Sequence, residues 1–165
     1  MQAIEILLQS WIDEKLLPGA ALRIVREGRT CFSLDVGTTS LGGSQPITKD
    51  TLFDLASLTK VTATLPAALL LMQDGKLAAD ERIGAFFADC PPDKADITIG
   101  QLLTHTSGLA ADLEVRTRNS DIDLPELLYR QTLLHKPGEQ VVYSDLGMIW
   151  LGLLIEKLAE KPLDK

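Results

Sequence analysis

Only one stretch of the chain has the pattern of β-strands. Residues 20–25 and 30–36 are two runs rich in β-branched and apolar side chains, and the segment Arg26-Glu27-Gly28-Arg29 between them predicts a hairpin with a glycine turn. An isolated two-stranded ribbon is only marginally stable in water unless another element covers it. The hairpin therefore needs another element to cover it.

The remaining segments have the periodicity and the punctuation of helices. Apolar residues at positions 4, 7, 8, 11 and 12 share one face of a helix that Pro18-Gly19 ends. Residues 57–72 predict the most apolar helix, which we expect to be the central one, with a kink at Pro66 and an end over residues 73–76.

Three more helices are predicted in the second half of the chain. A capping box over residues 98–101 begins a short helix that ends near Gly108, and another helix runs from Pro125 to about Leu134. The last helix carries apolar residues between Leu146 and Leu158 on one face. One hairpin followed by helices is typical of the α+β class.

Composition and charge exclude several classes of protein. The 165 residues suit a single domain, and the net charge of −7 comes from scattered acidic residues, which argues against nucleic acid as a partner. No apolar run approaches the roughly 18 residues of a membrane span. No signal peptide is visible, so we expect a cytoplasmic protein or an exported one whose leader has been removed.

No metal or cofactor site is indicated by the sequence. Cys31 and Cys90 lie far apart with no Cys/His grouping near them, so we expect two buried free thiols and neither a zinc site nor a disulfide. The glycines at positions 37, 42 and 43 lack the lysine of a phosphate-binding loop.

Ser57 and Lys60 form a Ser-x-x-Lys motif at the start of the apolar helix. Residues three positions apart on a helix share a face, so the hydroxyl and the amine are expected to be neighbours. A serine becomes a nucleophile when a base removes its proton, and a lysine serves as that base when its pKa is lowered. The backbone N–H of Ser57 would also face a developing oxyanion. The alternative is an N-cap serine followed by a solvated lysine.

Tyr143-Ser144-Asp145 is a second candidate segment, between the Pro137-Gly138 turn and the last apolar helix. A rigid corner at this point would hold the Tyr143 hydroxyl where it could relay a proton. The alternative is that Tyr143 is a partly buried aromatic residue and Asp145 a helix N-cap, and the spacing leaves both interpretations open.

Three ordered blocks resemble the serine β-lactamase and penicillin-binding-protein superfamily, most closely its class C-like serine hydrolase branch. They are residues 51–60, TLFDLASLTK, residues 102–109, LLTHTSGL, and the segment from Pro137-Gly138 to residues 143–147, YSDLG. The likeness extends from about Pro18 to Lys165. It implies a β-lactamase/transpeptidase-like fold and an acyl-enzyme mechanism with Ser57 as the nucleophile, Lys60 as its base partner and Tyr143 as the proton relay to the leaving group.

The sequence departs from that family at two places. Position 145 is aspartate, whereas the branch usually has Tyr-x-Asn, and a carboxylate donates no hydrogen bond to a substrate carbonyl unless it is protonated. We nevertheless assign Asp145 to substrate binding. The third motif of the family, Lys or His, then Thr or Ser, then Gly, has no match after Tyr143.

The missing motif leads to an expectation about the chain as a whole. We expect residues 1–165 to be a single N-terminal portion of the domain, in which the hairpin belongs to an incomplete antiparallel sheet. Its unpaired edge would then invite self-association or pairing with a C-terminal fragment. Both histidines are expected to be structural, His105 as a hydrogen-bonded residue in a turn between helices and His135 at the surface.

The leading functional hypothesis is a serine hydrolase that acts through an acyl-enzyme on an ester, a β-lactam or a D-Ala-D-Ala peptide, without a cofactor. The principal alternative is a binding or sensor domain that retains the fold without turnover. Asp145 and the missing third motif favour this alternative, whereas Ser57, Lys60 and Tyr143 together argue against it. A helical domain without any site is the remaining interpretation.

Overall fold

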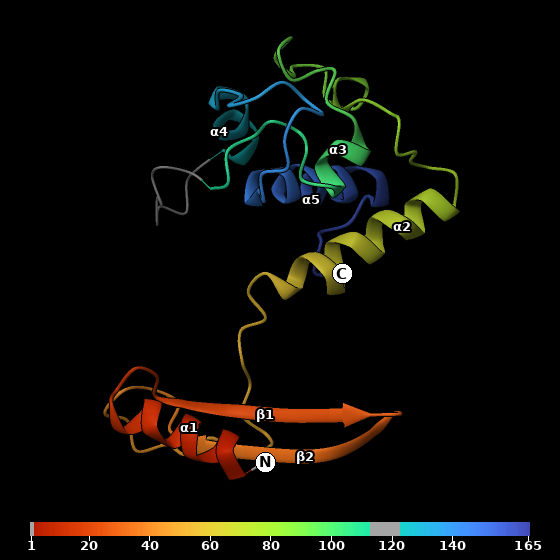
Figure 1. Ribbon diagram of the computed structural model, residues 1–165. Coiled ribbons are helices and arrows are strands. Elements are labelled where there is room, and N and C mark those ends of the chain that lie inside the picture. Colours follow the sequence, from red (N-terminus) through yellow and green to blue (C-terminus); the bar gives the residue numbers. More distant parts are fainter. Residues whose placement is uncertain (1, 113–122) are drawn as a thin grey trace. The chain divides into compact units, whose positions relative to one another are not determined.

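The computed structural model describes residues 2–112 and 123–165. They form two units, one up to residue 54 and one from residue 55 onward (Figure 1). None of the helices in the described ranges combines the length and the hydrophobicity that crossing a membrane requires.

The first unit is the predicted hairpin with a helix packed on it. Helix α1 (Gln2–Asp13) contacts strands β1 (Gly19–Arg26) and β2 (Arg29–Gly37), which pair antiparallel (Figure 1). Glu27 and Gly28 at the turn both have positive φ, at 51° and 75°, which is the backbone of the turns that match the twist of paired strands. Within the described residues the sheet has no third strand.

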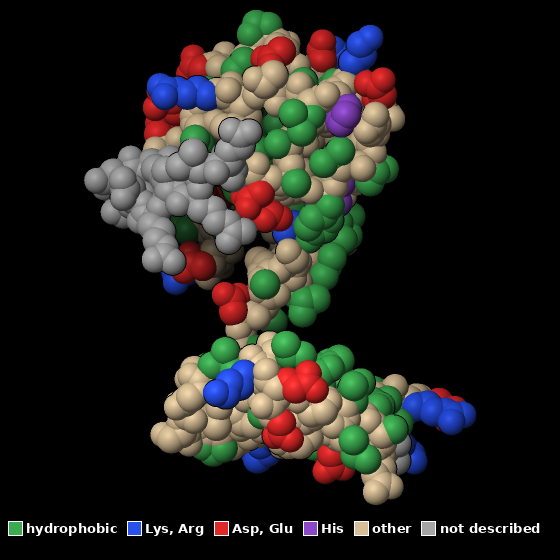
Figure 2. Space-filling view, turned by 60° about the vertical axis from the view of Figure 1, so that its left-hand side comes forward, with side chains coloured by type: hydrophobic (Ala, Val, Ile, Leu, Met, Phe, Trp, Pro, Cys, Tyr) green, Lys and Arg blue, Asp and Glu red, His purple; other side chains and the backbone are tan. Residues whose placement is uncertain are grey.

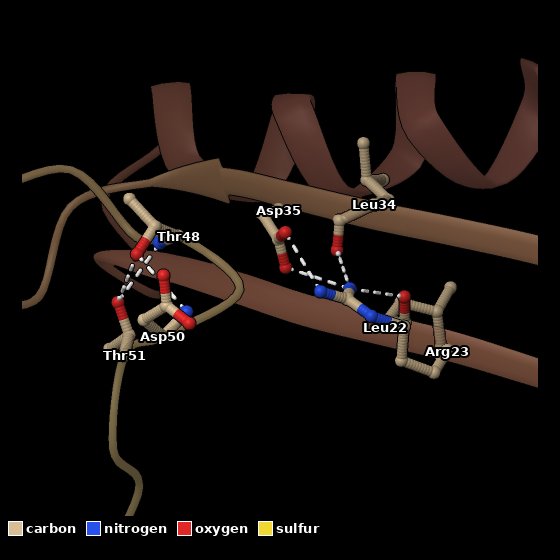
Figure 3. Close-up of polar contacts among 7 residues, drawn as sticks. All are labelled: Leu22, Arg23, Leu34, Asp35, Thr48, Asp50 and Thr51. Carbon is tan, nitrogen blue, oxygen red and sulfur yellow. Dashed lines mark hydrogen bonds and ion pairs between the residues drawn. The ribbon is translucent and has the colours of Figure 1, made fainter.

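An ion pair links the two strands of the hairpin. Arg23 on β1 lies with its guanidinium 2.7 Å from the carboxylate of Asp35 on β2, and it also donates to the carbonyl oxygens of Leu22 and Leu34 (Figure 3). The hydrogen bond from Arg23 lowers the pKa of Asp35. After β2 the chain turns at Thr48, whose backbone N–H donates to the hydroxyl of Thr51 at 2.9 Å (Figure 3).

The expectation that both cysteines are buried is wrong for Cys31. Cys31 and Ser33 alternate with Phe32 and Leu34 along β2, and the period of two places the cysteine on the exposed side of the strand. Cys90 is half-buried against the core of the second unit, and this burial raises the pKa of its thiol.

The second unit is helical, and its core surrounds the last helix, α5 (Asp145–Ala159). Helices α2 (Leu65–Gln73), α3 (Ile99–Leu103) and α4 (Leu124–Arg130) all pack against α5 (Figure 1). The fully buried Trp150 of α5 lies between Phe87 and Tyr129, with ring centroids 5.1 and 5.4 Å away. The short 3-10 helix η2 (Ile83–Ala85) contributes Ile83 to the same core.

The apolar helix that was expected at the centre lies at the side of this core. Ala68 and Leu71 of α2 are buried, whereas Leu69 and Leu70 are more than half exposed. Hydrophobic side chains accordingly reach the surface of this unit, and of the first unit as well (Figure 2). High hydrophobicity alone did not determine which helix occupies the centre.

Three helices differ in extent from the sequence prediction, and one of them is α3, which ends at Leu103 instead of near Gly108. The helix over residues 57–72 contains a π-helical segment, η1 (Lys60–Thr64), in which the N–H of Leu65 donates to the carbonyl of Lys60. Pro66 has no N–H to continue a regular ladder, and it occupies the first turn of α2. Helix α4 ends at Arg130 instead of about Leu134, because residues beyond it pair elsewhere: the N–H of Leu134 donates to the carbonyl of Gly108.

Candidate active site

The candidate nucleophile and the candidate base are neighbours in the structure. Ser57 lies in the turn that leads into the first helical residues, and the Nζ of Lys60 donates to its Oγ at 3.0 Å. The Lys60 side chain is only 12% exposed, whereas Ser57 is exposed. The spacing of three therefore brings the two groups into hydrogen-bond contact, as the sequence predicts.

The backbone immediately before Ser57 is strained. Ala56 has a φ of 45°, in the left-handed region that residues with a Cβ rarely occupy. A turn begins at Ala56 itself, because the N–H of Thr59 donates to the carbonyl of Ala56 at 3.0 Å. Strained residues of this kind cluster at functional sites, where the surrounding structure holds them.

Tyr143 reaches the same place from a segment far away in the sequence. The Nζ of Lys60 lies 4.9 Å from the centroid of the Tyr143 ring. Hydrogen bonds with Ser57 and then with Lys60 lower the pKa of the Tyr143 hydroxyl. Ser57, Lys60 and Tyr143 thus form one cluster.

Asp145 pairs with Lys60, a contact that spacing could not predict. The carboxylate lies 2.6 Å from the Nζ of Lys60, and its side chain is 46% exposed. The hydrogen bond that Lys60 donates to Asp145 is the main cause that raises the pKa of Lys60, burial opposes it, and Tyr143 adds a smaller increase. The amine is therefore held in its charged form.

Ser144 fixes the corner of the chain that carries Tyr143 and Asp145. Its buried Oγ donates to the carbonyl of Ala110 at 2.6 Å and accepts from the N–H of Gly147, which makes Ser144 the N-cap of α5. Asp145 is therefore the first residue of the helix and not its N-cap, contrary to one of the alternatives left open by the sequence. Its own N–H donates to the carbonyl of Ala111 at 2.7 Å.

A cavity of about 360 Å³ opens beside the cluster. Lys60 and Asp145 line it together with apolar side chains of α5, including Met148, Ile149 and Leu153. Its wall combines a charged pair with apolar surface, as small-molecule sites commonly do. Across residues 2–112 and 123–165, no group of three or more His, Cys, Asp or Glu side chains is arranged to hold a metal ion.

Two residues of the site were not identified as functional candidates from the sequence. Ala56 carries no chemical signal, because only its backbone angle is unusual. His105 was interpreted as structural, yet its ring centroid lies 4.6 Å from that of Tyr143. Its position two residues beyond the end of α3, where glycine is common, is the signal that could have drawn attention to it.

Comparison with solved structures identifies the class of the fold. The hydrolase EstCE1, described as having promiscuous acyltransferase activity, matches 98% of this chain and 48% of its own length, with a TM-score of 0.82 and 27% identity. The D-amino acid amidase of Ochrobactrum anthropi SV3 matches 98% of this chain and 45% of its own, with a TM-score of 0.80 and 28% identity. The fold is β-lactamase/transpeptidase-like, as the sequence predicts.

Sequence comparison then gives the family. Residues 8–165 match the family described as Beta-lactamase, and the chain belongs to that family. The N-acetylmuramyl-L-alanine amidase of Bacillus subtilis strain 168 is 34% identical over 172 residues, which cover 89% of this chain and 38% of the relative. The chain spans less than half the length of this and other curated relatives.

Proposed function

We propose that the protein is a serine hydrolase that acts through an acyl-enzyme on an ester or an amide. The observation that carries the proposal is the contact of Lys60 Nζ with Ser57 Oγ at 3.0 Å, with the ring of Tyr143 facing the same amine. A serine hydroxyl in contact with proton-transfer groups is the arrangement that nucleophilic catalysis requires. Relatives named as an amidase and as a hydrolase with acyltransferase activity support this class of reaction.

The directions of the pKa shifts suggest which group receives the proton. The pKa of Lys60 is raised and that of Tyr143 is lowered, so the charged amine next to a phenolate is favoured relative to the free side chains. In our proposal the Ser57 proton passes to the Tyr143 oxygen while Oγ attacks the carbonyl carbon, and protonated Lys60 stabilises the phenolate. This assigns to Tyr143 the role of base that the sequence suggested for Lys60.

The second half of the cycle follows from the same groups. The tetrahedral oxyanion faces the backbone N–H of Ser57, and collapse breaks the bond to the leaving group as Tyr143 returns the proton to it. Water then attacks the ester carbonyl on Ser57 as Tyr143 takes one of its protons. Collapse breaks the bond to Oγ and releases the carboxylic acid, while Tyr143 returns that proton to Oγ. Each step moves one proton between the Tyr143 oxygen and a neighbouring oxygen or leaving-group nitrogen and requires no cofactor.

Asp145 and the cavity bear on the substrate. Because the Asp145 carboxylate accepts from Lys60 at 2.6 Å, it offers no hydrogen-bond donor to a substrate carbonyl, and we propose that esters are preferred to β-lactams and peptides. The apolar wall formed by Met148, Ile149 and Leu153 suits an apolar group on the acyl side. Acetyl through octanoyl esters of p-nitrophenol would measure how much the cavity contributes.

A binding or sensor domain without turnover is the second candidate, and one observation favours it. The carboxylate of Asp145 neutralises the positive charge of Lys60, and this charge would otherwise stabilise a phenolate on Tyr143. A sensor of this kind would still acylate at Ser57 but would not release the acyl group, so the rate of deacylation separates it from a hydrolase.

Covalent labelling tests whether Ser57 is the nucleophile of the proposed hydrolase, and the rate of deacylation then separates the hydrolase from the sensor. The intact protein is exposed to a fluorophosphonate and to a labelled penicillin, and the adduct is located by intact mass and peptide mapping. We expect one fluorophosphonate on Ser57, none in Ser57→Ala, and full labelling in Ser33→Ala, which removes an exposed serine of β2. Labelling that persists in Ser57→Ala, or its absence from the parent, would contradict the proposal.

A further inference from the structure

We propose that His105 is the positioning residue of Tyr143, holding the tyrosine ring and the backbone on both sides of it. The inference rests on the proposed function, in which Tyr143 exchanges a proton with Ser57. His105 follows α3, and Tyr143 precedes α5, so the contact joins segments that are far apart in the sequence. Three separate contacts carry the argument.

Two of the contacts are hydrogen bonds from the residues that flank Tyr143. The N–H of Val142 donates to the backbone carbonyl of His105 at 2.8 Å, and the N–H of Ser144 donates to the Nδ1 of the His105 ring at 3.1 Å. One residue therefore satisfies the backbone donors before and after Tyr143. While both hydrogen bonds are made, the peptide units on either side of Tyr143 have little freedom to rotate.

The third contact is between the rings. The centroids of His105 and Tyr143 lie 4.6 Å apart, at an interplanar angle of 39°. Lys60 Nζ lies 4.9 Å from the centroid of the same Tyr143 ring. The Tyr143 ring is therefore contacted both by His105 and by the amine that is proposed to stabilise its phenolate.

The backbone of His105 is in a conformation that is strained for a residue with a side chain. Helix α3 ends in a Schellman motif: the N–H of Thr106 donates to the carbonyl of Gln101 at 2.8 Å, and the N–H of His105 donates to the carbonyl of Leu102 at 3.2 Å. The residue at the place of His105 must be left-handed, and its φ is 58°. Glycine is the usual residue at this position because it has no Cβ. Glycine would close the motif equally well but would supply neither the ring nor the Nδ1 acceptor.

The acceptor role fixes the protonation of the ring. An Nδ1 that accepts from Ser144 carries no proton, so the imidazole is neutral with its proton on Nε2. Burial lowers the pKa of His105, the charge of Lys60 lowers it further, and Asp145 opposes both. The neutral form that positions Tyr143 is thus favoured by the groups around it.

Replacement of His105 by glycine separates a positioning role from a structural one. If His105 only terminates α3, His105→Gly relieves backbone strain and leaves acylation unchanged. If it positions Tyr143, the variant keeps its midpoint of thermal unfolding within a few degrees but acylates Ser57 about 10- to 100-fold more slowly. His105→Asn tolerates the left-handed backbone and retains an acceptor, so it should recover part of the rate. His135→Asn, which alters the other histidine, is the matched control.

A second variant tests whether the effect passes through the tyrosine. In a Tyr143→Phe background, His105→Gly should slow acylation by less than about twofold further, because the hydroxyl that His105 positions is already absent. Equal slowing in both backgrounds would overturn the proposal, as would a parent-like rate in His105→Gly.

A readout independent of turnover keeps the inference testable if the protein proves inactive. The chain has two tyrosines, so ultraviolet titration of the intact protein, with Tyr143→Phe as the reference, assigns the phenolate of Tyr143. The pKa of Tyr143 is lowered by hydrogen bonds with Ser57 and Lys60 that depend on its position, so His105→Gly should raise it. An unchanged Tyr143 titration would refute positioning, whereas failure of Ser57 labelling in the parent would refute only the proposed hydrolase.

Discussion

If the proposed hydrolase activity is present, replacement of Asp145 by asparagine is expected to shift it from esters toward amides. The change removes one negative charge 2.6 Å from the Nζ of Lys60 and keeps the shape of the side chain. The start of α5 should survive, because Ser144 is its N-cap and the bond from residue 145 to Ala111 is made by the backbone. The asparagine also offers an N–H to a substrate carbonyl.

The size of the effect follows from the separation and the exposure of the pair. Two unit charges at 2.6 Å attract by about 1.6 kcal/mol in bulk water, and exposed pairs usually contribute about 0.2–1 kcal/mol to stability. The Lys60 side chain is 12% exposed and that of Asp145 is 46% exposed, so we expect the interaction energy of this pair to be about 1 to 1.6 kcal/mol. A difference of that size corresponds to a change of about 5- to 15-fold in relative rate.

The direction of the pH effect can also be stated. Asp145 raises the pKa of Lys60, and the proposed mechanism needs this amine charged, so activity falls as the pH rises through the Lys60 pKa. Asp145→Asn lowers that pKa and moves the alkaline limb to lower pH. The stabilisation from the pair is complete below the pKa of lysine in the unfolded chain and is lost as the pH rises through the folded pKa. The variant should lose less stability over this alkaline range.

The assay compares a p-nitrophenyl ester with the p-nitroanilide of the same acid. The ratio of kcat/KM for the anilide to kcat/KM for the ester should rise about 5- to 15-fold in Asp145→Asn. Asp96→Asn, which removes the exposed partner of Arg82, is the matched control and should leave the ratio unchanged. A ratio that stays constant in folded Asp145→Asn would refute the reasoning, and so would an alkaline limb that does not move.

Four further outcomes are expected. Tyr143→Phe should slow acylation about 100-fold or more, with a larger loss on alkyl than on p-nitrophenyl esters, and an unchanged rate on alkyl esters would exclude the hydroxyl from the mechanism. Trp150→Ala removes a fully buried ring and should lower the free energy of unfolding by about 3–5 kcal/mol in a urea titration, whereas a loss below about 1 kcal/mol would contradict the packing described. Gly108→Ala should cost about 2 kcal/mol or more, because φ is 82° and the new Cβ would lie 2.1 Å from the carbonyl oxygen of His135; unchanged stability would argue against this approach. Light scattering of residues 1–165 should give a mass above the 18.0 kDa of one chain if the edges of the hairpin pair with another copy, and a monomer would exclude that.

Local patterns in the sequence were sufficient for most of the elements and for one contact of the candidate site. The two runs rich in β-branched and apolar residues, with the glycine turn between them, predicted the hairpin, and the capping box at Thr98 and Gln101 is present as expected. The spacing of three brought Ser57 and Lys60 together, because a single local turn relates them: the N–H of Lys60 donates to the carbonyl of Ser57 at 3.1 Å. These features depend on residues close in sequence, and their geometry follows from the backbone alone.

The tertiary structure decided everything that joins distant segments. The pairing of Lys60 with Asp145 depends on how η1 packs against α5, and the contact of His105 with Tyr143 depends on how α3 packs against α5; no periodicity encodes either. The same packing makes α5 the centre of its unit although the helix that begins at Leu65 is more apolar over its length. Burial depends on the partner that each face meets, and for that reason the protonation of the site could be worked out only after the fold was known.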